Sequence, residues 1–334
     1  MCQQLVTNDF IDTKIIMSKR NPLQSLFAEA VNFSKSDFHF LSYSFTLAYI
    51  SICIYLNYNT GFYQEVMRKS YFTDNSLWTF PLFYAFMYFS VAIPVLLFQK
   101  EYKLLQNKDF YYKSLFFIVL YGLAVGYFGY RNWEFPTLFT VEKQFMFRVL
   151  SQLKGGFIII LPLLLLKFTI DKKVNGLYGL ARNANHIRGY LAIYAIMLTF
   201  LIAISYTSDF MSAYPQFRPW MNEGVFGWPL WLTTLVFETT YSIDFVMTEL
   251  MFRGALVIGM ISIMGRQAIL PMVGMYAAIH FGKPVGETIS SIFGGYILGV
   301  LAYQTRHIWG GVIVHICIAL TMEVMGFLHY YAVK

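Results

Sequence analysis

The chain alternates between long apolar stretches and shorter polar linkers. In the first two thirds, apolar stretches lie at about residues 38–57, 77–98, 114–131, 150–168 and 190–206. Their lengths fit the ~20 helical residues that cross the core of a bilayer. Because lipid offers the backbone no hydrogen-bond partners, each stretch is expected to be a helix.

The last third begins with a longer apolar stretch, from Phe226 to Met264. At a rise of ~1.5 Å per residue, one helix of this length is too long for a single crossing, so we expect two helices that divide near Asp244. Further helices are expected at about 268–281, 287–304 and 308–331. The pattern predicts an all-α, polytopic membrane helical bundle with about 8–10 transmembrane helices.

The polar segments divide the chain into three regions. Residues 1–37 are polar and lack the pattern of a secretory signal peptide, so we expect a cytoplasmic tail. The N-terminal transmembrane helices occupy 38–206, and a C-terminal membrane domain occupies 225–331. The most polar interior segment, 167–189, marks the boundary between the two halves.

The composition agrees with a membrane protein. Of the 334 residues, 57% are hydrophobic and 13% are charged, against about 25% charged in an average soluble domain. Too few polar residues are available to cover a soluble globule. The net charge of +7 fits loop charge in a membrane protein, so we expect the lipid bilayer as a partner and no nucleic acid.

Lysine and arginine are concentrated in alternate segments. Four or five lie in each of the segments 1–37, 99–113 and 167–189. Only one or two lie in each of the segments 58–76, 132–149 and 207–225. By the positive-inside rule, the sequence predicts a multi-pass protein of the inner or plasma membrane with a cytoplasmic N-terminus.

Ionisable residues within apolar helices distinguish the C-terminal domain. It contains Glu238, Asp244, Glu249, Arg253, His280, Glu287, His315 and Glu323. A charged residue at the centre of a membrane helix costs about 2.5–3.5 kcal/mol, so such residues persist where they pair or line a wet cavity. The functional site is therefore expected in this domain.

Four of these residues form the candidate site. Glu249 and Arg253 share one helical face at i, i+4, either as a buried ion pair or with the guanidinium keeping a catalytic carboxylate ionised. We expect Glu249, His280 and His315 to meet in one polar cavity. Such a set can activate water for hydrolysis, or it can hold a divalent metal such as zinc; the spacing leaves both open.

These residues stand in a recognisable order. The segment Thr248-Glu249-Leu-Met-Phe-Arg253 resembles the Glu-Glu-x-x-x-Arg motif of the CPBP family, and Tyr276-x-x-x-His280 resembles its Phe-x-x-x-His motif. The family includes the CAAX prenyl endopeptidases and the bacteriocin-processing and abortive-infection-like membrane proteins.

Two further segments extend the resemblance over residues 228–323. The segment from Ile308 to His315 is similar to the family's final histidine motif, and Gly294 to Gly299 looks like its glycine-rich helix. The resemblance implies an intramembrane endopeptidase that cuts a membrane-proximal peptide or protein. Many family members are described as metalloproteases, so zinc is an alternative cofactor at family level.

The resemblance also implies a role for each candidate residue. Glu249 would be the general base and Arg253 its orienting partner. His280 would be a co-base, and His315 would donate a hydrogen bond to the oxyanion.

Two residues depart from the family pattern. Thr248 replaces the first glutamate, and Ala319 replaces the asparagine one turn after the last histidine. Asp244 and Glu323 are candidate substitute acids, and Tyr276 is a candidate accessory residue. These departures favour an alternative function, a catalytically inactive membrane scaffold or immunity protein. A transporter is a third alternative, against which the absence of inverted repeats argues.

Overall fold

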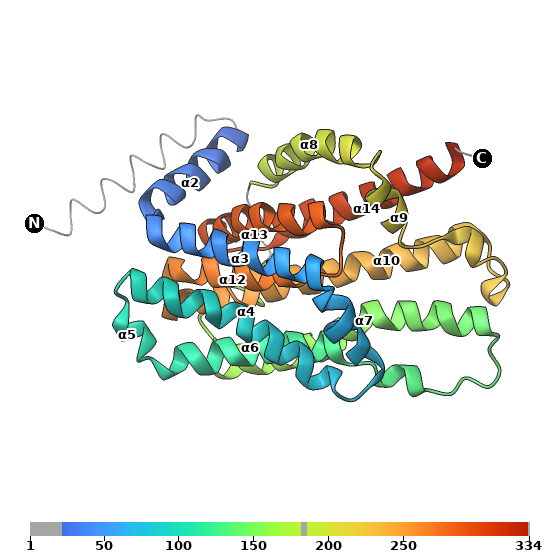
Figure 1. The fold of residues 1–334 in the computed structure, drawn as a ribbon, viewed down its shortest axis with the longest axis horizontal. Coiled ribbons are helices and arrows are strands. Elements are labelled where there is room, and N and C mark those ends of the chain that lie inside the picture. Colours follow the sequence, from blue (N-terminus) through green and yellow to red (C-terminus); the bar gives the residue numbers. More distant parts are fainter. Residues whose placement is uncertain (1–21, 182–185, 333–334) are drawn as a thin grey trace, which may run out of the picture.

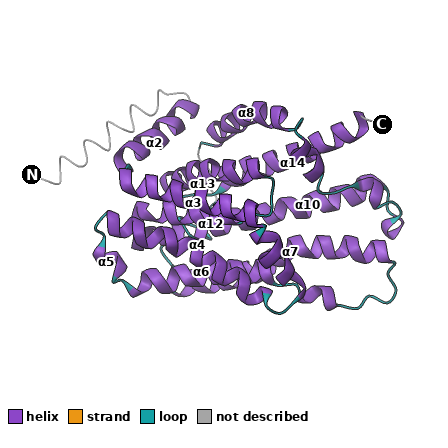
Figure 2. Cartoon of the chain, viewed as in Figure 1, coloured by secondary structure: helices purple, strands orange, loops and turns teal. Residues whose placement is uncertain are grey.

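A computed structural model describes residues 22–181 and 186–332, which contain helices and loops but no strand (Figure 2). In these residues, eight helical segments are long and apolar enough to cross a membrane. The predicted all-α, multi-pass membrane bundle is therefore confirmed.

The N-terminal half supplies five long helices. They are α3 (Phe40–Thr60), α4 (Ser76–Phe98), α6 (Lys108–Gly126), α7 (Thr140–Thr169) and α8 (Ile187–Ile204). The short helix α5 (Tyr102–Leu105) connects α4 to α6, and these two long helices pack against each other (Figure 1). Helix α8 lies on the outside of the bundle, where it packs against α14 (Trp309–Ala332).

The described part of the predicted tail is a helix. Helix α2 (Pro22–Asp37) packs against α8 and α13 (Val285–Thr305), and it buries Leu26 and Phe33. Residues 1–21 lie outside the described residues. Helices α2 and α5 lie at the same end of the bundle, on the left in Figure 1. The assignment of that end to the cytoplasm stays a prediction.

The C-terminal half begins after the short helix α9 (Ser208–Ala213). Its elements are α10 (Leu230–Glu249), a π-helix (Leu250–Ala255), α11 (Ile261–Met264), α12 (Ile269–Ala278), α13 and α14. The predicted break near Asp244 is wrong, because α10 runs through this residue without interruption. The regular helix instead ends at Glu249, where the π-helix begins.

Asp244 and the π-helix pack against different parts of the chain. The side chain of Asp244 lies beside Gly155 of α7, so it projects from the side of an uninterrupted helix. The π-helix instead packs on the loop after α7: a Cβ at Gly254 would lie 2.6 Å from the carbonyl oxygen of Tyr178. The hydroxyl of Tyr178 in turn donates a hydrogen bond to the carboxylate of Asp171, with an oxygen–oxygen distance of 2.6 Å. A π-helical turn is rare and is often found at a functional site.

Candidate active site

Glu249 lies at the end of α10 and has no solvent exposure (0%). Its Oε1 accepts hydrogen bonds from Arg253 Nη1 at 2.9 Å and from His315 Nδ1 at 3.1 Å. The ion pair expected from the i, i+4 spacing is therefore present and buried. Through His315, the same oxygen also connects α10 to α14.

Arg253 joins a third element to the site. It lies in the π-helix, and its guanidinium carbon is 4.0 Å from the centroid of the Tyr276 ring on α12. A cation over an aromatic face is stabilised by the quadrupole of the ring. Because the guanidinium is buried, it depends on Glu249 and Tyr276 to offset its loss of hydration.

The hydrogen bond of His280 fixes its tautomer. Its Nδ1 lies 2.8 Å from the carbonyl oxygen of Tyr276. Since a carbonyl can only accept, Nδ1 carries the proton, and Nε2 of the neutral ring carries a lone pair. His280 lies beyond the end of α12, and burial lowers its pKa to about 4, so the ring is neutral at pH 7.

His315 has the same tautomer for a different reason. An ionised carboxylate can only accept, so His315 Nδ1 donates to Glu249 and Nε2 of the neutral ring is unprotonated. The ring of Tyr276 lies beside both imidazoles, with its centroid 4.8 Å from that of His280 and 6.5 Å from that of His315. The His315 side chain is 15% exposed, whereas Glu249 is fully covered.

Gly311 makes room for the carboxylate. It lies one turn before His315 on α14, and a Cβ at this position would overlap Glu249 Oε2. In the sequence, the Gly310-Gly311 pair before the final histidine is the feature that marks this position. The sequence alone does not show which residue Gly311 faces.

Adding a methyl group at Gly311 is expected to displace the carboxylate. Alanine favours a helix over glycine by about 1 kcal/mol, so Gly311→Ala would stabilise α14 if space were available. Instead the methyl group would push on an oxygen that Arg253 and His315 hold in place. We expect Gly311→Ala to lose about 1–3 kcal/mol of stability, measured as a lower thermal midpoint in detergent micelles.

Gly294 on α13 is the matched control, because a Cβ there would meet nothing within 4 Å. Gly294→Ala should keep or slightly raise the midpoint. Equal midpoints for the two variants would contradict the close contact between Gly311 and Glu249.

The two candidate substitute acids are engaged elsewhere. Asp244 faces α7, and the carboxylate of Glu323 accepts the backbone N–H groups of Gln216 and Phe217 at 2.8 and 3.2 Å. Thr248, which precedes Glu249 in the sequence, is buried. Of the predicted accessory residues, Tyr276 is the one whose contacts with Arg253, His280 and His315 make it part of the site.

The candidate zinc ligands do not form a coordination sphere. Among residues 22–181 and 186–332, no group of three or more His, Cys, Asp or Glu side chains is arranged to hold a metal ion. In both imidazoles Nδ1 makes the hydrogen bond, and Nε2 of the neutral ring keeps the lone pair that a metal ion would bind. Zinc as a cofactor stays a prediction, and we derive no step through a metal.

A comparison with known families matches the part of the chain that contains the candidate residues. The family model described as type II CAAX prenyl endopeptidase Rce1-like matches residues 227–321, a range that contains all four candidate residues. No curated protein and no solved structure matches the chain. The molecule is thus a multi-pass membrane protein. Its residues 227–321 are similar to the Rce1-like family, and we refer to them as the Rce1-like part.

Proposed function

We propose that the protein is an intramembrane endopeptidase that hydrolyses a peptide bond of a membrane-proximal substrate. The observation that carries this proposal is the 3.1 Å contact between Glu249 Oε1 and His315 Nδ1 inside the Rce1-like part. A carboxylate bound to Nδ1 leaves Nε2 of the imidazole as the base and stabilises the imidazolium that forms.

The burial of Glu249 indicates that its carboxylate acts through His315 rather than by direct contact with the attacking water. One carboxylate oxygen is occupied by Arg253 and His315, and the other lies against Gly311 with no hydrogen-bond partner. We therefore assign the general base to His315 Nε2. This differs from the roles that the family resemblance implied, in which Glu249 was the base and His315 the oxyanion donor.

The two imidazoles would share one water molecule. His315 Nε2 takes one proton as the water oxygen attacks the peptide carbonyl carbon, while His280 Nε2 accepts a hydrogen bond from the other hydrogen. The C–N bond then breaks, and the proton on His315 Nε2 passes to the leaving nitrogen. The products are a carboxylic acid and an amine. Arg253 keeps the Glu249 carboxylate in place throughout.

Replacing His315 is the direct test. Wild type and variants would be reconstituted in liposomes with a library of membrane-anchored peptides, and the products would be read by mass spectrometry. We expect His315→Gln to lower the cleavage rate by about 10²–10⁴-fold and His280→Gln to have a smaller effect.

His329→Gln is the matched control, because His329 lies on the same helix but contacts Ser205, with Nε2 3.0 Å from Oγ. It should cleave at the wild-type rate. Cleavage by His315→Gln at the wild-type rate would contradict the assignment of the base.

An inactive scaffold or immunity protein is the second candidate function. It is favoured by Ala319, which is 4% exposed and places a methyl group where the family has an amide, and by Thr248. If the wild type cleaves no peptide in the library and Thr248→Glu does, the scaffold function is the correct one.

A further inference from the structure

The direction of the His280 ring is set by a turn rather than by a helix. Helix α12 ends at Ala278, and His280 lies in the turn that leads to α13. Its N–H donates to the carbonyl of Ala277 at 3.1 Å, and its carbonyl accepts the N–H of Lys283 at 2.9 Å. The hydrogen bonds that hold this turn therefore decide where the imidazole points.

Asn57 of α3 connects this turn to the N-terminal half. Its Nδ2 donates to the carbonyl of Phe281 at 3.0 Å, and its Oδ1 accepts the backbone N–H of Tyr63 at 3.0 Å. The Tyr63 ring packs on Gly282, where any Cβ would overlap it. The Asn57 side chain is 4% exposed. A buried amide in a membrane-spanning helix is costly unless it is hydrogen-bonded, and this one is bonded through both of its polar atoms.

Helix α13 holds the same turn from the other side. Thr288 Oγ1 donates to the carbonyl of His280 at 2.6 Å, and Thr288 has no solvent exposure. The Tyr58 hydroxyl lies 2.7 Å from Thr288 Oγ1 and 2.6 Å from the carbonyl oxygen of Lys283. The carbonyl groups around the histidine are thus bound by side chains from α3 and α13.

We propose that Asn57 and Thr288 are positioning residues for His280, which they hold so that its Nε2 meets the water that His315 activates. This inference rests on the proposed function for the identity of that water. Asn57 lies outside the Rce1-like part at 227–321, so the N-terminal half would complete the active site rather than only anchor it.

The test replaces Asn57 with leucine, which has a similar size and no polar group. Asn59→Leu is the matched control, because Asn59 is on the same helix but is exposed and donates to the carbonyl of Tyr55 within that helix. We expect Asn57→Leu to lower kcat by about 10- to 100-fold with KM changed less than about twofold, since a small misplacement of a catalytic group mainly affects the reacting geometry. Asn59→Leu should change neither.

A second readout does not depend on cleavage. Solid-state NMR of ¹⁵N-histidine protein in liposomes at one fixed pH reports the Nδ1–H tautomer of each ring, and His280→Gln assigns the signal of His280. Asn57→Leu should move or broaden that signal, and Asn59→Leu should not. Thr288→Val keeps the shape of the side chain and removes its hydroxyl donor, so it should have the same effect on the His280 signal. It replaces Asn57→Leu in this test if Asn57→Leu does not fold.

The outcomes separate the two proposals. An unchanged His280 signal and an unchanged kcat in Asn57→Leu and Thr288→Val would overturn the positioning role. If the wild type cleaves nothing but Asn57→Leu moves the His280 signal, the proposed function fails while the positioning of His280 stands.

Discussion

Replacing Arg253 with methionine is expected to cost about 3–5 kcal/mol of folding stability, because it leaves the Glu249 carboxylate buried without its partner. Methionine has a similar length and fills the space, so the loss would report the charge rather than a cavity. Both side chains are at most 1% exposed. The variant should show a clearly lower unfolding midpoint in micelles and a lower yield of folded protein in membranes.

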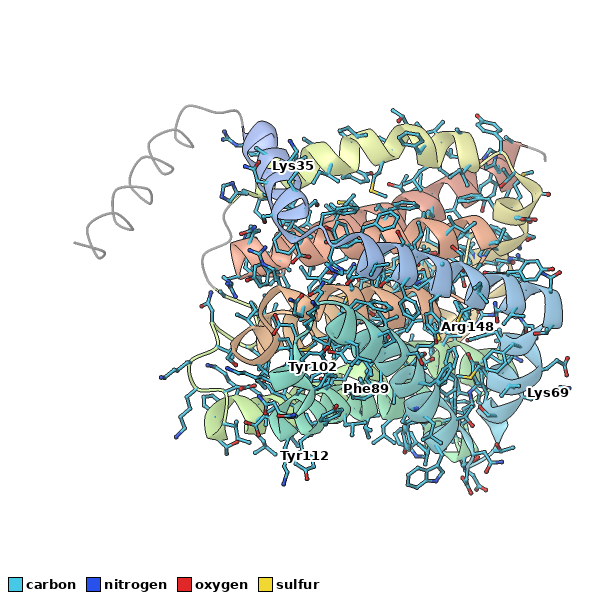
Figure 3. The ribbon with its side chains drawn as sticks, turned by 60° about the vertical axis from the view of Figure 1, so that its left-hand side comes forward. Lys35, Lys69, Phe89, Tyr102, Tyr112 and Arg148 are labelled. Atoms are coloured by element: carbon cyan, nitrogen blue, oxygen red, sulfur yellow. The ribbon has the colours of Figure 1, made fainter. Side chains whose placement is uncertain are left out.

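An exposed pair with the same spacing is the control. Lys69 and Glu65 form an i, i+4 ion pair whose side chains are 68% and 60% exposed, and Lys69 projects from the bundle in Figure 3. Lys69→Met should change stability by less than about 1 kcal/mol. The double variant Glu249→Gln/Arg253→Met, which removes both charges, should be more stable than Arg253→Met alone. Equal losses of folding stability for Lys69→Met and Arg253→Met would show that burial does not strengthen the Glu249–Arg253 ion pair.

Hydropathy located the membrane helices better than it located their ends. The observed α7 begins at Thr140, whereas the apolar pattern began near residue 150. The missing turns contain Glu142, which lies in the first turn and accepts the N–H groups of Phe139 and Phe226 at 2.9 and 3.1 Å. A charged residue at a helix start lowers the local hydropathy, although it stabilises the helix by capping it.

The predicted break near Asp244 failed for a related reason. The expected division was placed at an acid within an apolar stretch, but Gly155 on α7 accommodates the side chain of Asp244 within the bundle. The irregular segment is the π-helix, which packs through Gly254 on the loop around Tyr178. This contact joins distant segments of the chain, and no local sequence pattern contains it.

The sequence predicted contacts of Glu249 but not those of Asn57. Glu249 and Arg253 were paired correctly because residues four apart share a helical face. The expected meeting of Glu249 and His315 is also confirmed, although it joins α10 to α14. The contact between Asn57 and Phe281 crosses between the halves of the chain and was not predicted. An asparagine in an apolar stretch was the available signal for Asn57, but its partner could be found only in the folded structure.

Glu249→Gln is expected to abolish detectable cleavage while the protein remains in the membrane. Glutamine has nearly the same size, and its carbonyl oxygen can still accept from Arg253 and His315. It carries no charge, so it cannot stabilise the imidazolium that forms on His315 during attack. We expect a loss of about 10²–10⁴-fold in rate, measured with the peptide library in liposomes.

The control variant Glu238→Gln tests whether the loss of any buried carboxylate on this helix lowers the cleavage rate. Glu238 lies on the same helix, and its carboxylate oxygens are also buried, but it does not contact His315 or Arg253. This variant should therefore cleave at the wild-type rate. Because Glu249→Gln also leaves Arg253 without a counter-charge, its unfolding midpoint must be measured beside its rate. A folded Glu249→Gln protein that still cleaves at the wild-type rate would show that the carboxylate serves the fold alone, and the base would then have to act without it.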